Sequence, residues 1–226
     1  MSATEPTRLG KNKTSALIRT LAQQAGSPAA EGRPIGGFRF SLAMPVAVVL
    51  AIMAALVVVI TVIGPRPDLD SNFFTWMFQF KLALTLLAAF GTGLLARNAA
   101  IAGARITIIP MLLPAAALML AGILFDSSGF PLLGIHTLSA PRCLVSIVIA
   151  SLPALGLILA AMRRGIPTRP AFAGGLAGAL AGSLGAMAYA IACVNDGTSF
   201  VAVWYTSAIA IVALIGAAIG ARALAW

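Results

Sequence analysis

Apolar runs of about 20 residues recur along the chain between short clusters of charged and turn-forming residues. Six such runs lie at about 42 to 63, 74 to 96, 104 to 125, 143 to 162, 171 to 193 and 200 to 221. Each is long enough for a helix to cross a bilayer core, which needs about 20 residues. Runs such as Val46 to Val62 do not alternate polar and apolar residues, as transmembrane strands do. The pattern therefore predicts an all-α, polytopic bundle of six transmembrane helices.

Composition supports an integral membrane protein and divides the chain in two. Hydrophobic residues make up 60% of the sequence and charged residues 9%, with a mean hydropathy of +1.01. Soluble domains carry roughly a quarter charged residues. Residues 1–41 are rich in Gly, Pro, Ser, Thr and charge, which predicts a largely flexible segment with one short helix. Residues 42–226 form the predicted membrane domain and leave no room for a soluble catalytic domain.

Charged residues orient the predicted bundle. Twelve of the 15 Lys and Arg residues fall on one side, and four of the six acids fall on the other. Because basic loops stay in the cytoplasm, both termini are predicted to be cytoplasmic. The twelve bases are Arg8, Lys11, Lys13, Arg19, Arg33, Arg39, Arg97, Arg105, Arg163, Arg164, Arg169 and Arg222, and the four acids are Asp68, Asp70, Asp126 and Asp196.

The formal net charge of +9 raises the question of nucleic-acid binding. The bases are divided among four cytoplasmic segments and contain no recognisable nucleic-acid recognition module. Contact with anionic lipids and membrane orientation explain them better. We therefore expect membrane lipids, and no nucleic acid, as direct partners of these residues.

One stretch of the N-terminal segment has helical spacing. Thr14 or Ser15 can cap a short helix that places Leu17, Ile18 and Leu21 on one face. A helix this short is marginal alone, because isolated helices below about 12 to 15 residues rarely persist in water. Two interpretations stay open: folding against a partner, and lying on the lipid surface as an amphipathic helix.

Lys81 is the ionisable residue that lies well inside a predicted span. It is about seven residues from the outer end, or on the order of 10 Å deep at 1.5 Å per residue. An intramembrane charge is a candidate functional residue. At this shallow depth the favoured interpretation is that Lys81 reaches toward the outer surface and pairs with Asp126 or Asp70.

Glycine repeats in spans five and six predict close helix packing. Gly174, Gly178 and Gly182 recur at every fourth position, and Gly216 and Gly220 repeat that spacing. Glycine at this interval lets two helix backbones approach closely. We expect these residues to pack spans of one bundle together rather than to form a dimer interface.

The two cysteines, Cys143 and Cys193, lie at mirrored positions about the basic loop at residues 163–170, so both are predicted at the extracytoplasmic edge of adjacent helices. A disulfide needs Cα atoms within roughly 7 Å, whereas the axes of adjacent helices lie about 8 to 10 Å apart. The thiols can therefore meet only if each cysteine lies on the side of its helix that faces the other helix. A structural disulfide, inert buried thiols and a redox or soft-metal sensor all stay open. His136, in the same outer loop, is a candidate third ligand or a solvated side chain.

Catalytic constellations are absent from the sequence. The chain has one histidine, no G-x-S-x-G, no phosphate loop and no C-x-x-C. We therefore expect no enzyme activity, no small-molecule substrate and no required cofactor, with a soft-metal ion at the thiols as the one candidate ligand.

An ordered set of motifs resembles the NrsF family of bacterial membrane anti-sigma factors. It comprises Cys143 at the start of span four, Met162-Arg163-Arg164-Gly165 followed by Arg169-Pro170-Ala171, the Gly/Ala-rich fifth span ending in Tyr189 and Cys193, Phe200-Val201-Ala202-Val203-Trp204-Tyr205, Phe80-Lys81-Leu82, and Leu17-Ile18-x-x-Leu21. The resemblance implies a multi-pass protein of the bacterial inner membrane. Its cytoplasmic N-terminal segment would hold an extracytoplasmic-function sigma factor inactive.

The resemblance and the residues together give a working hypothesis. An oxidant or soft metal acting on Cys143 and Cys193 would release the sigma factor, which is held by Leu17, Ile18 and Leu21. The H-x-x-x-C-x-x-C signature of zinc-binding anti-sigma domains is absent, so the contact would use the short helix and nearby bases. The alternatives are a small transporter or channel, and a membrane assembly factor, either with a structural outer disulfide.

Overall fold

The computed structural model describes residues 14–20, 37–101, 104, 106–126, 129, 131–134 and 138–225. Two units are separable, Met1–Phe38 and Arg39–Trp226. In the first unit, residues 14–20 form a helix. In the second, the long elements are α3 (Gly37–Val58) with the π-helical turn η1 (Val59–Ile63), α5 (Trp76–Ala99), α6 (Ile108–Leu124), α7 (Ser139–Met162), α8 (Pro170–Tyr189) and α9 (Thr198–Ala223). The short α4 (Leu69–Asn72) joins η1 to α5.

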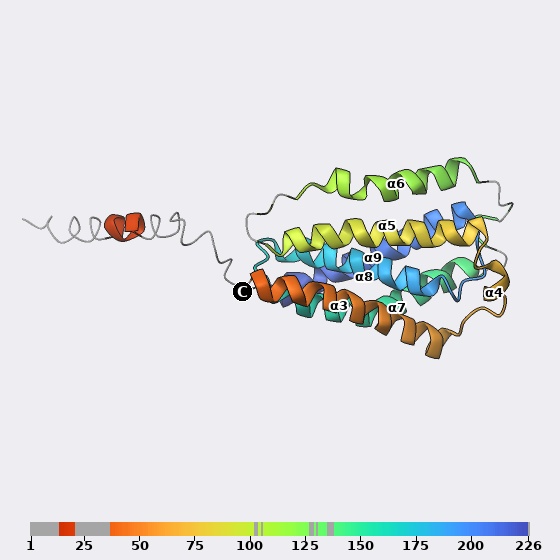
Figure 1. Cartoon of the computed structure of the whole chain (residues 1–226), viewed down its shortest axis with the longest axis horizontal. Coiled ribbons are helices and arrows are strands. Elements are labelled where there is room, and N and C mark those ends of the chain that lie inside the picture. The colour runs from red at the N-terminus through yellow and green to blue at the C-terminus, as the bar shows by residue number, and fades with distance from the viewer. Residues whose placement is uncertain are drawn as a thin grey trace, which may run out of the picture. The chain divides into compact units, whose positions relative to one another are not determined.

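The long helices of the second unit lie side by side along one axis (Figure 1). Helix α8 occupies the centre and packs against α9, α7 and α5, while α6 lies against α5 and α9 on one flank. Helix α3 lies on another flank (Figure 1). Every element that the structure describes is helical, a turn or a loop, which confirms the predicted all-α class.

Within the described part of the chain, five helices are long and apolar enough to cross a membrane: the stretch Leu42–Ile63 and helices α5, α7, α8 and α9. The remaining predicted span corresponds to α6, which is apolar but has 17 residues. At 1.5 Å per residue α6 is about 25 Å long, against roughly 30 Å for a hydrocarbon core. The six-span arrangement therefore stays a prediction.

Two predicted boundaries are wrong in ways that affect the site. Helix α8 ends at Tyr189, so Cys193 lies in the connection to α9 rather than in a helix. Helix α7 begins at Ser139, so Cys143 is already within its second turn. The apolar residues that follow Tyr189 continue the hydrophobic run without continuing the helix, which is why the sequence pattern placed the end too late.

Glycines determine how closely α8 approaches α9. A Cβ on Gly178 would lie 2.8 Å from the Cα of Ala213, and one on Gly220 would lie 3.0 Å from the carbonyl oxygen of Pro170. Contacts this close leave no room for a side chain. The prediction that these glycines pack two spans of one chain together is therefore confirmed.

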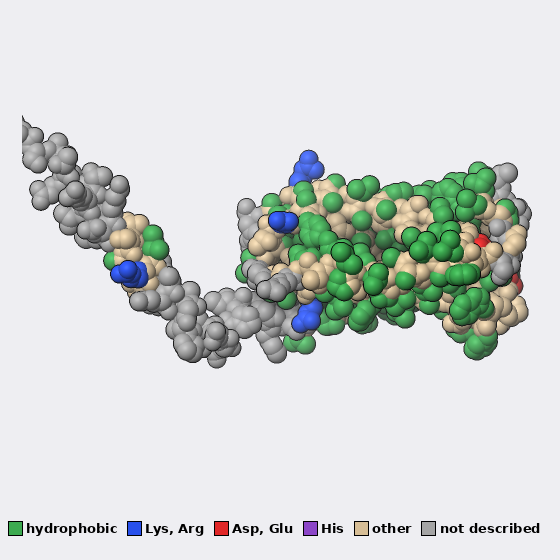
Figure 2. Space-filling model, turned by 90° about the horizontal axis from the view of Figure 1, so that it is seen from above, with side chains coloured by type: hydrophobic (Ala, Val, Ile, Leu, Met, Phe, Trp, Pro, Cys, Tyr) green, Lys and Arg blue, Asp and Glu red, His purple; other side chains and the backbone are tan. Residues whose placement is uncertain are grey.

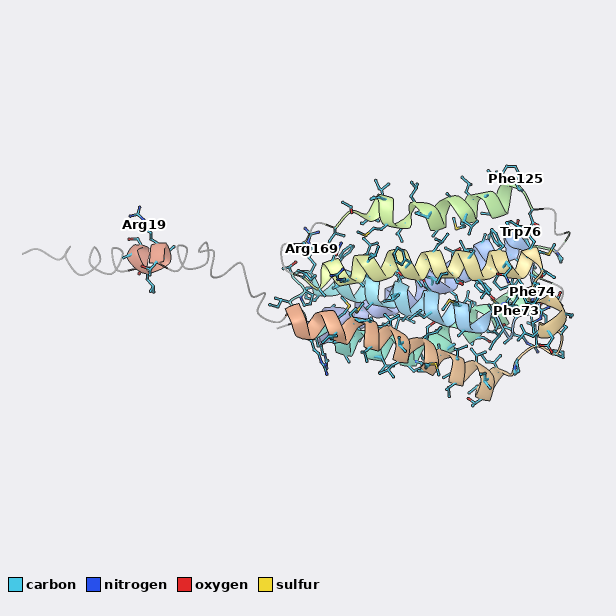
Figure 3. The ribbon with its side chains drawn as sticks, in the orientation of Figure 1. Arg19, Phe73, Phe74, Trp76, Phe125 and Arg169 are labelled. Atoms are coloured by element: carbon cyan, nitrogen blue, oxygen red, sulfur yellow. The ribbon has the colours of Figure 1, made fainter. Side chains whose placement is uncertain are left out.

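The two ends of the bundle carry opposite charges. Lys and Arg side chains gather at one end of the surface and acidic side chains at the other (Figure 2). At the basic end, Arg163 Nε donates to the carbonyl oxygen of Ala223 at 2.9 Å, and the backbone N–H of Ile166 donates to Ala100 at 3.0 Å. At the other end stand Phe73, Phe74, Trp76 and Phe125, opposite Arg169 (Figure 3). We refer to the end where the Lys and Arg side chains gather as the basic end, and to the end where the acidic side chains gather as the acidic end.

Candidate functional site

The connection between α8 and α9, residues 190–197, contains the second cysteine and an acidic residue at the acidic end of the bundle. Cys193 is 2% exposed and Asp196 6% exposed, so the connection folds into the protein. The backbone N–H of Arg66, which follows η1, donates to the carbonyl oxygen of Ile191 at 3.0 Å. The chain that leaves α3 is thus bonded directly to this connection.

Asp196 accepts hydrogen bonds from two cations that come from different elements. Lys81 Nζ, on α5, lies 2.6 Å from Asp196 Oδ1, and Arg66 Nη1 lies 2.7 Å from Asp196 Oδ2. Both cations also donate to the carbonyl oxygen of Cys193, Lys81 at 3.2 Å and Arg66 at 3.1 Å. We call Arg66, Lys81 and Asp196 the ionic clasp. It joins α3, α5 and the α8–α9 connection at the backbone of Cys193.

Burial makes the ionic clasp energetically important. The Lys81 side chain is 0% exposed and that of Asp196 is 8% exposed. The Lys81 ammonium also lies 5.9 Å from the ring centroids of Phe78 and Tyr205. Removing one partner from a buried pair leaves the other charge uncompensated, at a cost of about 3–5 kcal/mol. The expectation that Lys81 reaches the surface and pairs with Asp126 or Asp70 is therefore wrong, because Asp196 is folded inward to meet it.

Arg66 also binds a more exposed acid. Its Nε and Nη2 atoms donate to Asp68 Oδ1 and Oδ2, each at 2.7 Å. This two-pronged contact raises the pKa of Arg66 above its ordinary value, against the opposing effect of burial. The same hydrogen bonds from Arg66 lower the pKa of Asp68 to about 2. Arg66 is therefore a fixed positive charge that holds two carboxylates and one carbonyl.

Cys143 on α7 and Cys193 in the connection are brought together beneath the ionic clasp. Both are free thiols, and Cys143 is 1% exposed. Both side chains are buried within the same cluster, and Cys193 Sγ donates to the carbonyl oxygen of Asn195 at 3.6 Å. The structure therefore brings the two cysteines into one cluster, and a bond or a shared ion between them stays a prediction. The pair lies in one apolar cluster with Phe80, Tyr189, Phe200 and Tyr205.

Tyr205 closes the space around the thiols. It is fully buried in the same cluster as the two cysteines, and its ring centroid lies 6.3 Å from that of Tyr189. The Tyr205 hydroxyl has no hydrogen-bond partner within the described part of the chain. A buried hydroxyl without a partner is unfavourable by roughly 1–3 kcal/mol.

Two neighbouring thiols can react in two ways. Loss of two electrons and two protons joins them as a disulfide, and loss of the protons alone leaves two thiolates that select soft metal ions. Across the described residues, no group of three or more His, Cys, Asp or Glu side chains is placed to hold a metal. His136, the candidate auxiliary ligand, lies outside the described residues.

The predicted partner-binding residues lie in the first unit. Residues 14–20 are helical, and Thr20 Oγ1 donates to the carbonyl oxygen of Ala16 at 2.9 Å. Leu17 is 60% exposed and Ile18 61% exposed. Leu21 lies outside the described residues. Within its own unit the helix thus presents two apolar side chains that are not buried.

Sequence reasoning missed the roles of Arg66 and Asp196, which it treated as ordinary loop charges. One signal could have found Asp196. A lysine inside an apolar span needs a counter-ion, and Asp196 lies three residues from Cys193 in the connection that faces the same end. Arg66 gives no such signal, because its contacts depend on how the chain turns after η1.

Comparison with known proteins identifies the family. A family model described as NrsF, negative regulator of sigma F, matches residues 29–226. A probable anti-sigma-F factor NrsF from Azospira oryzae is 27% identical over 95% of this chain and 100% of its own length. The anti-sigma-F factor NrsF of Caulobacter vibrioides is 35% identical over 41% of this chain and 43% of its own. No solved structure matches the chain.

These matches confirm the resemblance to NrsF and the expectation that the protein is not an enzyme, since the family is regulatory. The match also extends over both cysteines, Lys81, Arg66 and Asp196. The chain belongs to the NrsF family of negative regulators of sigma F.

Proposed function

We propose that this protein is a multi-pass anti-sigma factor of the bacterial inner membrane, with both termini in the cytoplasm and α6 as its sixth span. The opposite charges of the two bundle ends support this orientation, because bases favour the cytoplasmic side (Figure 2). Exposed aromatic side chains support a membrane boundary at the acidic end: Phe74 is 87%, Trp76 74% and Phe125 80% exposed. Of these, Trp76 is of a residue type that is enriched where bilayer meets water.

The sigma factor is held by the N-terminal segment, through the helix at residues 14–20. The observation that carries this proposal is the exposure of Leu17 and Ile18 on a helix too short to persist alone. An apolar helix face of this kind binds in a groove of a partner through anchors three or four residues apart, which is the spacing of Leu17 and Ile18 from Leu21 in the sequence. We assign the partner to the extracytoplasmic-function class of sigma factors.

The signal acts at the acidic end, on Cys143 and Cys193. Their burial in one cluster supports this, because a disulfide or a two-thiolate metal site needs two cysteines that lie close together. Changing a two-state protein from 1:99 to 99:1 needs about 5.5 kcal/mol of differential stabilisation. An oxidant that accepts two electrons and two protons, or a soft metal ion that displaces two protons, supplies the change.

Recovery of the partner tests the sigma-binding part of the proposal. The full-length protein is tagged at its C-terminus and purified from membranes, and bound proteins are identified by mass spectrometry. We expect a sigma factor with the wild-type protein and none with the Leu17→Glu, Ile18→Glu variant. Ala16→Gln, on the opposite side of the same helix, is the matched control and should retain the partner. Equal recovery by all three proteins would rule out this binding face.

A second experiment tests the sensing part. Both cysteines are replaced by serine, and sigma-dependent transcription is measured before and after treatment with diamide or a soft-metal salt. The wild-type protein should give induction, and the double variant should stay at the uninduced level. Normal induction in the double variant would contradict a role for the thiols while leaving the sigma-binding result intact.

A further inference from the structure

Helix α3 is the part of the bundle that leads directly into the N-terminal segment. Its inward side chains are Met44, Ala47, Ala51, Ala55 and, in η1, Val59, all buried and spaced three or four residues apart along one face. Val48, Ile52, Leu56 and Val58 flank this face and are half-buried, and 22% of the most apolar window of α3 is buried inside the protein. α3 is therefore held to the bundle along one narrow face.

A groove runs beside α3 between Met44 and Ile52. The groove encloses about 640 Å³ between α3, α5 and α8, and its lining includes Val48, Ile52, Leu86, Phe90 and Leu184. Lipid or detergent tails can fill such a space, since it is lined almost entirely by apolar groups. Small shifts of α3 against the rest of the bundle thus disturb few protein contacts.

At the acidic end the same helix is held firmly. The chain turns at Gly64, which has a φ of +85°, and its N–H donates to the carbonyl oxygen of Val59 at 2.9 Å. Two residues later Arg66 enters the ionic clasp. Its backbone bonds Ile191 and its guanidinium bonds Asp196 and the carbonyl oxygen of Cys193. Arg66 is thus a direct connection between the end of α3 and the backbone of a thiol residue.

The geometry of these bonds makes them sensitive to Cys193. Hydrogen bonds weaken steeply when the angle at the donor falls or the distance grows. A disulfide between Cys193 and Cys143, or one ion bound by both sulfurs, would constrain the distance between the two Cα atoms, and a shift of the Cys193 backbone moves the carbonyl that Arg66 and Lys81 share. Lys81 is fixed within α5, which packs on α8. Arg66, in contrast, follows the end of α3, which is the helix that can shift.

We propose that Arg66 is the positioning residue that passes the state of the thiol pair to α3, and through α3 to the sigma-binding segment. This inference rests on the proposed function and deepens its regulation. In the reduced state the closed ionic clasp holds the end of α3 against residues 190–197. A change at Cys193 alters the two bonds from the Arg66 side chain, and α3 settles in a second position.

The test measures disulfide formation and sigma-dependent output in the same cells, so that a loss of sensing can be distinguished from a loss of coupling. Full-length wild-type protein, Arg66→Gln and Arg142→Gln are expressed with their sigma factor and treated with diamide, which takes two electrons and two protons from two thiols. Disulfide formation is followed by the loss of maleimide labelling, and output by a sigma-dependent reporter. Arg142, an exposed base beside Cys143, is the matched control for the same substitution at the same end.

In wild type and Arg142→Gln, reporter output should rise in step with disulfide formation. In Arg66→Gln the disulfide should still form, while the ratio of treated to untreated output falls close to unity. A wild-type ratio in Arg66→Gln overturns the coupling role. If instead the variant lacking both cysteines responds like wild type, the sensing proposal fails and coupling through Cys193 fails with it.

A second variant distinguishes a loss of coupling from misfolding of Arg66→Gln. Arg66→Lys keeps the positive charge opposite Asp196 but has one donor group in place of the guanidinium fork. We expect it to accumulate in membranes at the wild-type level and still to lose most of the induction ratio. A wild-type ratio of treated to untreated output in Arg66→Lys would contradict a role for the guanidinium group of Arg66.

A reciprocal measurement gives an independent check, because coupling between two sites acts in both directions. In purified wild-type protein, adding the sigma factor should change the rate at which maleimide labels the buried thiols. In Arg66→Lys the labelling rate should be the same with and without the sigma factor. An equal effect of sigma factor on both proteins overturns the proposal.

Discussion

Helices α8 and α3 are both apolar and long enough to cross a membrane, yet the protein holds them in opposite ways. In α8, 67% of the span is buried, and its glycines lie against the backbone of α9. In α3, 22% of the span is buried, and a groove lies between α3 and α5. Close packing of this kind resists displacement. The difference indicates a rigid core of α7, α8 and α9, and a peripheral helix whose position depends mainly on the ionic clasp.

The largest effect on this arrangement is expected from Asp196→Ala. The change leaves Arg66 and Lys81 buried without their shared carboxylate, which should destabilise the protein by about 3–5 kcal/mol. The measurement is the thermal unfolding midpoint of the purified protein in detergent. Asp70→Asn, an exposed acid at the same end, should change stability by less than about 0.5 kcal/mol. Equal midpoints for the two variants would show that the ionic clasp does not hold the bundle.

A smaller but still large effect is expected in the core from Gly178→Ala. The new Cβ would meet the Val212 carbonyl and the Cα of Ala213, so α8 and α9 must separate, at a cost of about 1–3 kcal/mol. Gly175→Ala is the control on the same helix, because its Cβ would first meet Ala217 at 3.6 Å. Unfolding midpoints in detergent should fall for the first variant only. A matching fall for both would count against the close α8–α9 contact.

The corresponding change in α3 should be tolerated better. Ala51 is fully buried against the core, and Ala51→Leu adds a larger side chain at that contact. Because α3 can shift outward, we expect a loss below about 1 kcal/mol, less than for Gly178→Ala. Thermal unfolding under the same conditions provides the comparison. A greater loss for Ala51→Leu than for Gly178→Ala would reverse the assignment of rigid and movable helices.

The smallest effect concerns Asp68 at the outer edge of the ionic clasp. Its pKa is lowered from 3.8 to about 2 by Arg66, so its carboxylate stabilises the fold above pH about 4. That contribution is lost as the pH falls toward about 2, where the folded protein also takes up the proton. Asp68→Asn should therefore flatten the dependence of the unfolding midpoint on pH between about 5 and 2. An unchanged acid dependence would mean that the Arg66 contact does not persist in solution.

The sequence predicts the helical architecture and the family well, because both depend on local patterns. Apolar runs identify the helices, and the order of the motifs identifies NrsF. The position of Cys193 was harder, since the apolar residues after Tyr189 continue the hydrophobic run while the backbone leaves the helix. Hydropathy reports where a segment is apolar and does not report where its hydrogen bonding ends.

Local pattern indicates only one member of the ionic clasp, Lys81, and does not identify its partners. Arg66, Lys81 and Asp196 are far apart in the chain, and each looks ordinary among its neighbours apart from the lysine in an apolar span. Their pairing depends on the turn at Gly64 and on the inward fold of residues 190–197. Contacts that arise from tertiary packing of three separate segments become visible only in the structure.

The most direct test of the account is capture of the sigma factor by the membrane-embedded protein before and after thiol oxidation. Tagged wild-type protein and the variant with serine at positions 143 and 193 are each purified from untreated and diamide-treated membranes. We predict that wild type carries the sigma factor only when untreated, whereas the serine variant carries it in both conditions. Equal amounts of sigma factor on wild-type protein before and after complete disulfide formation would contradict the account.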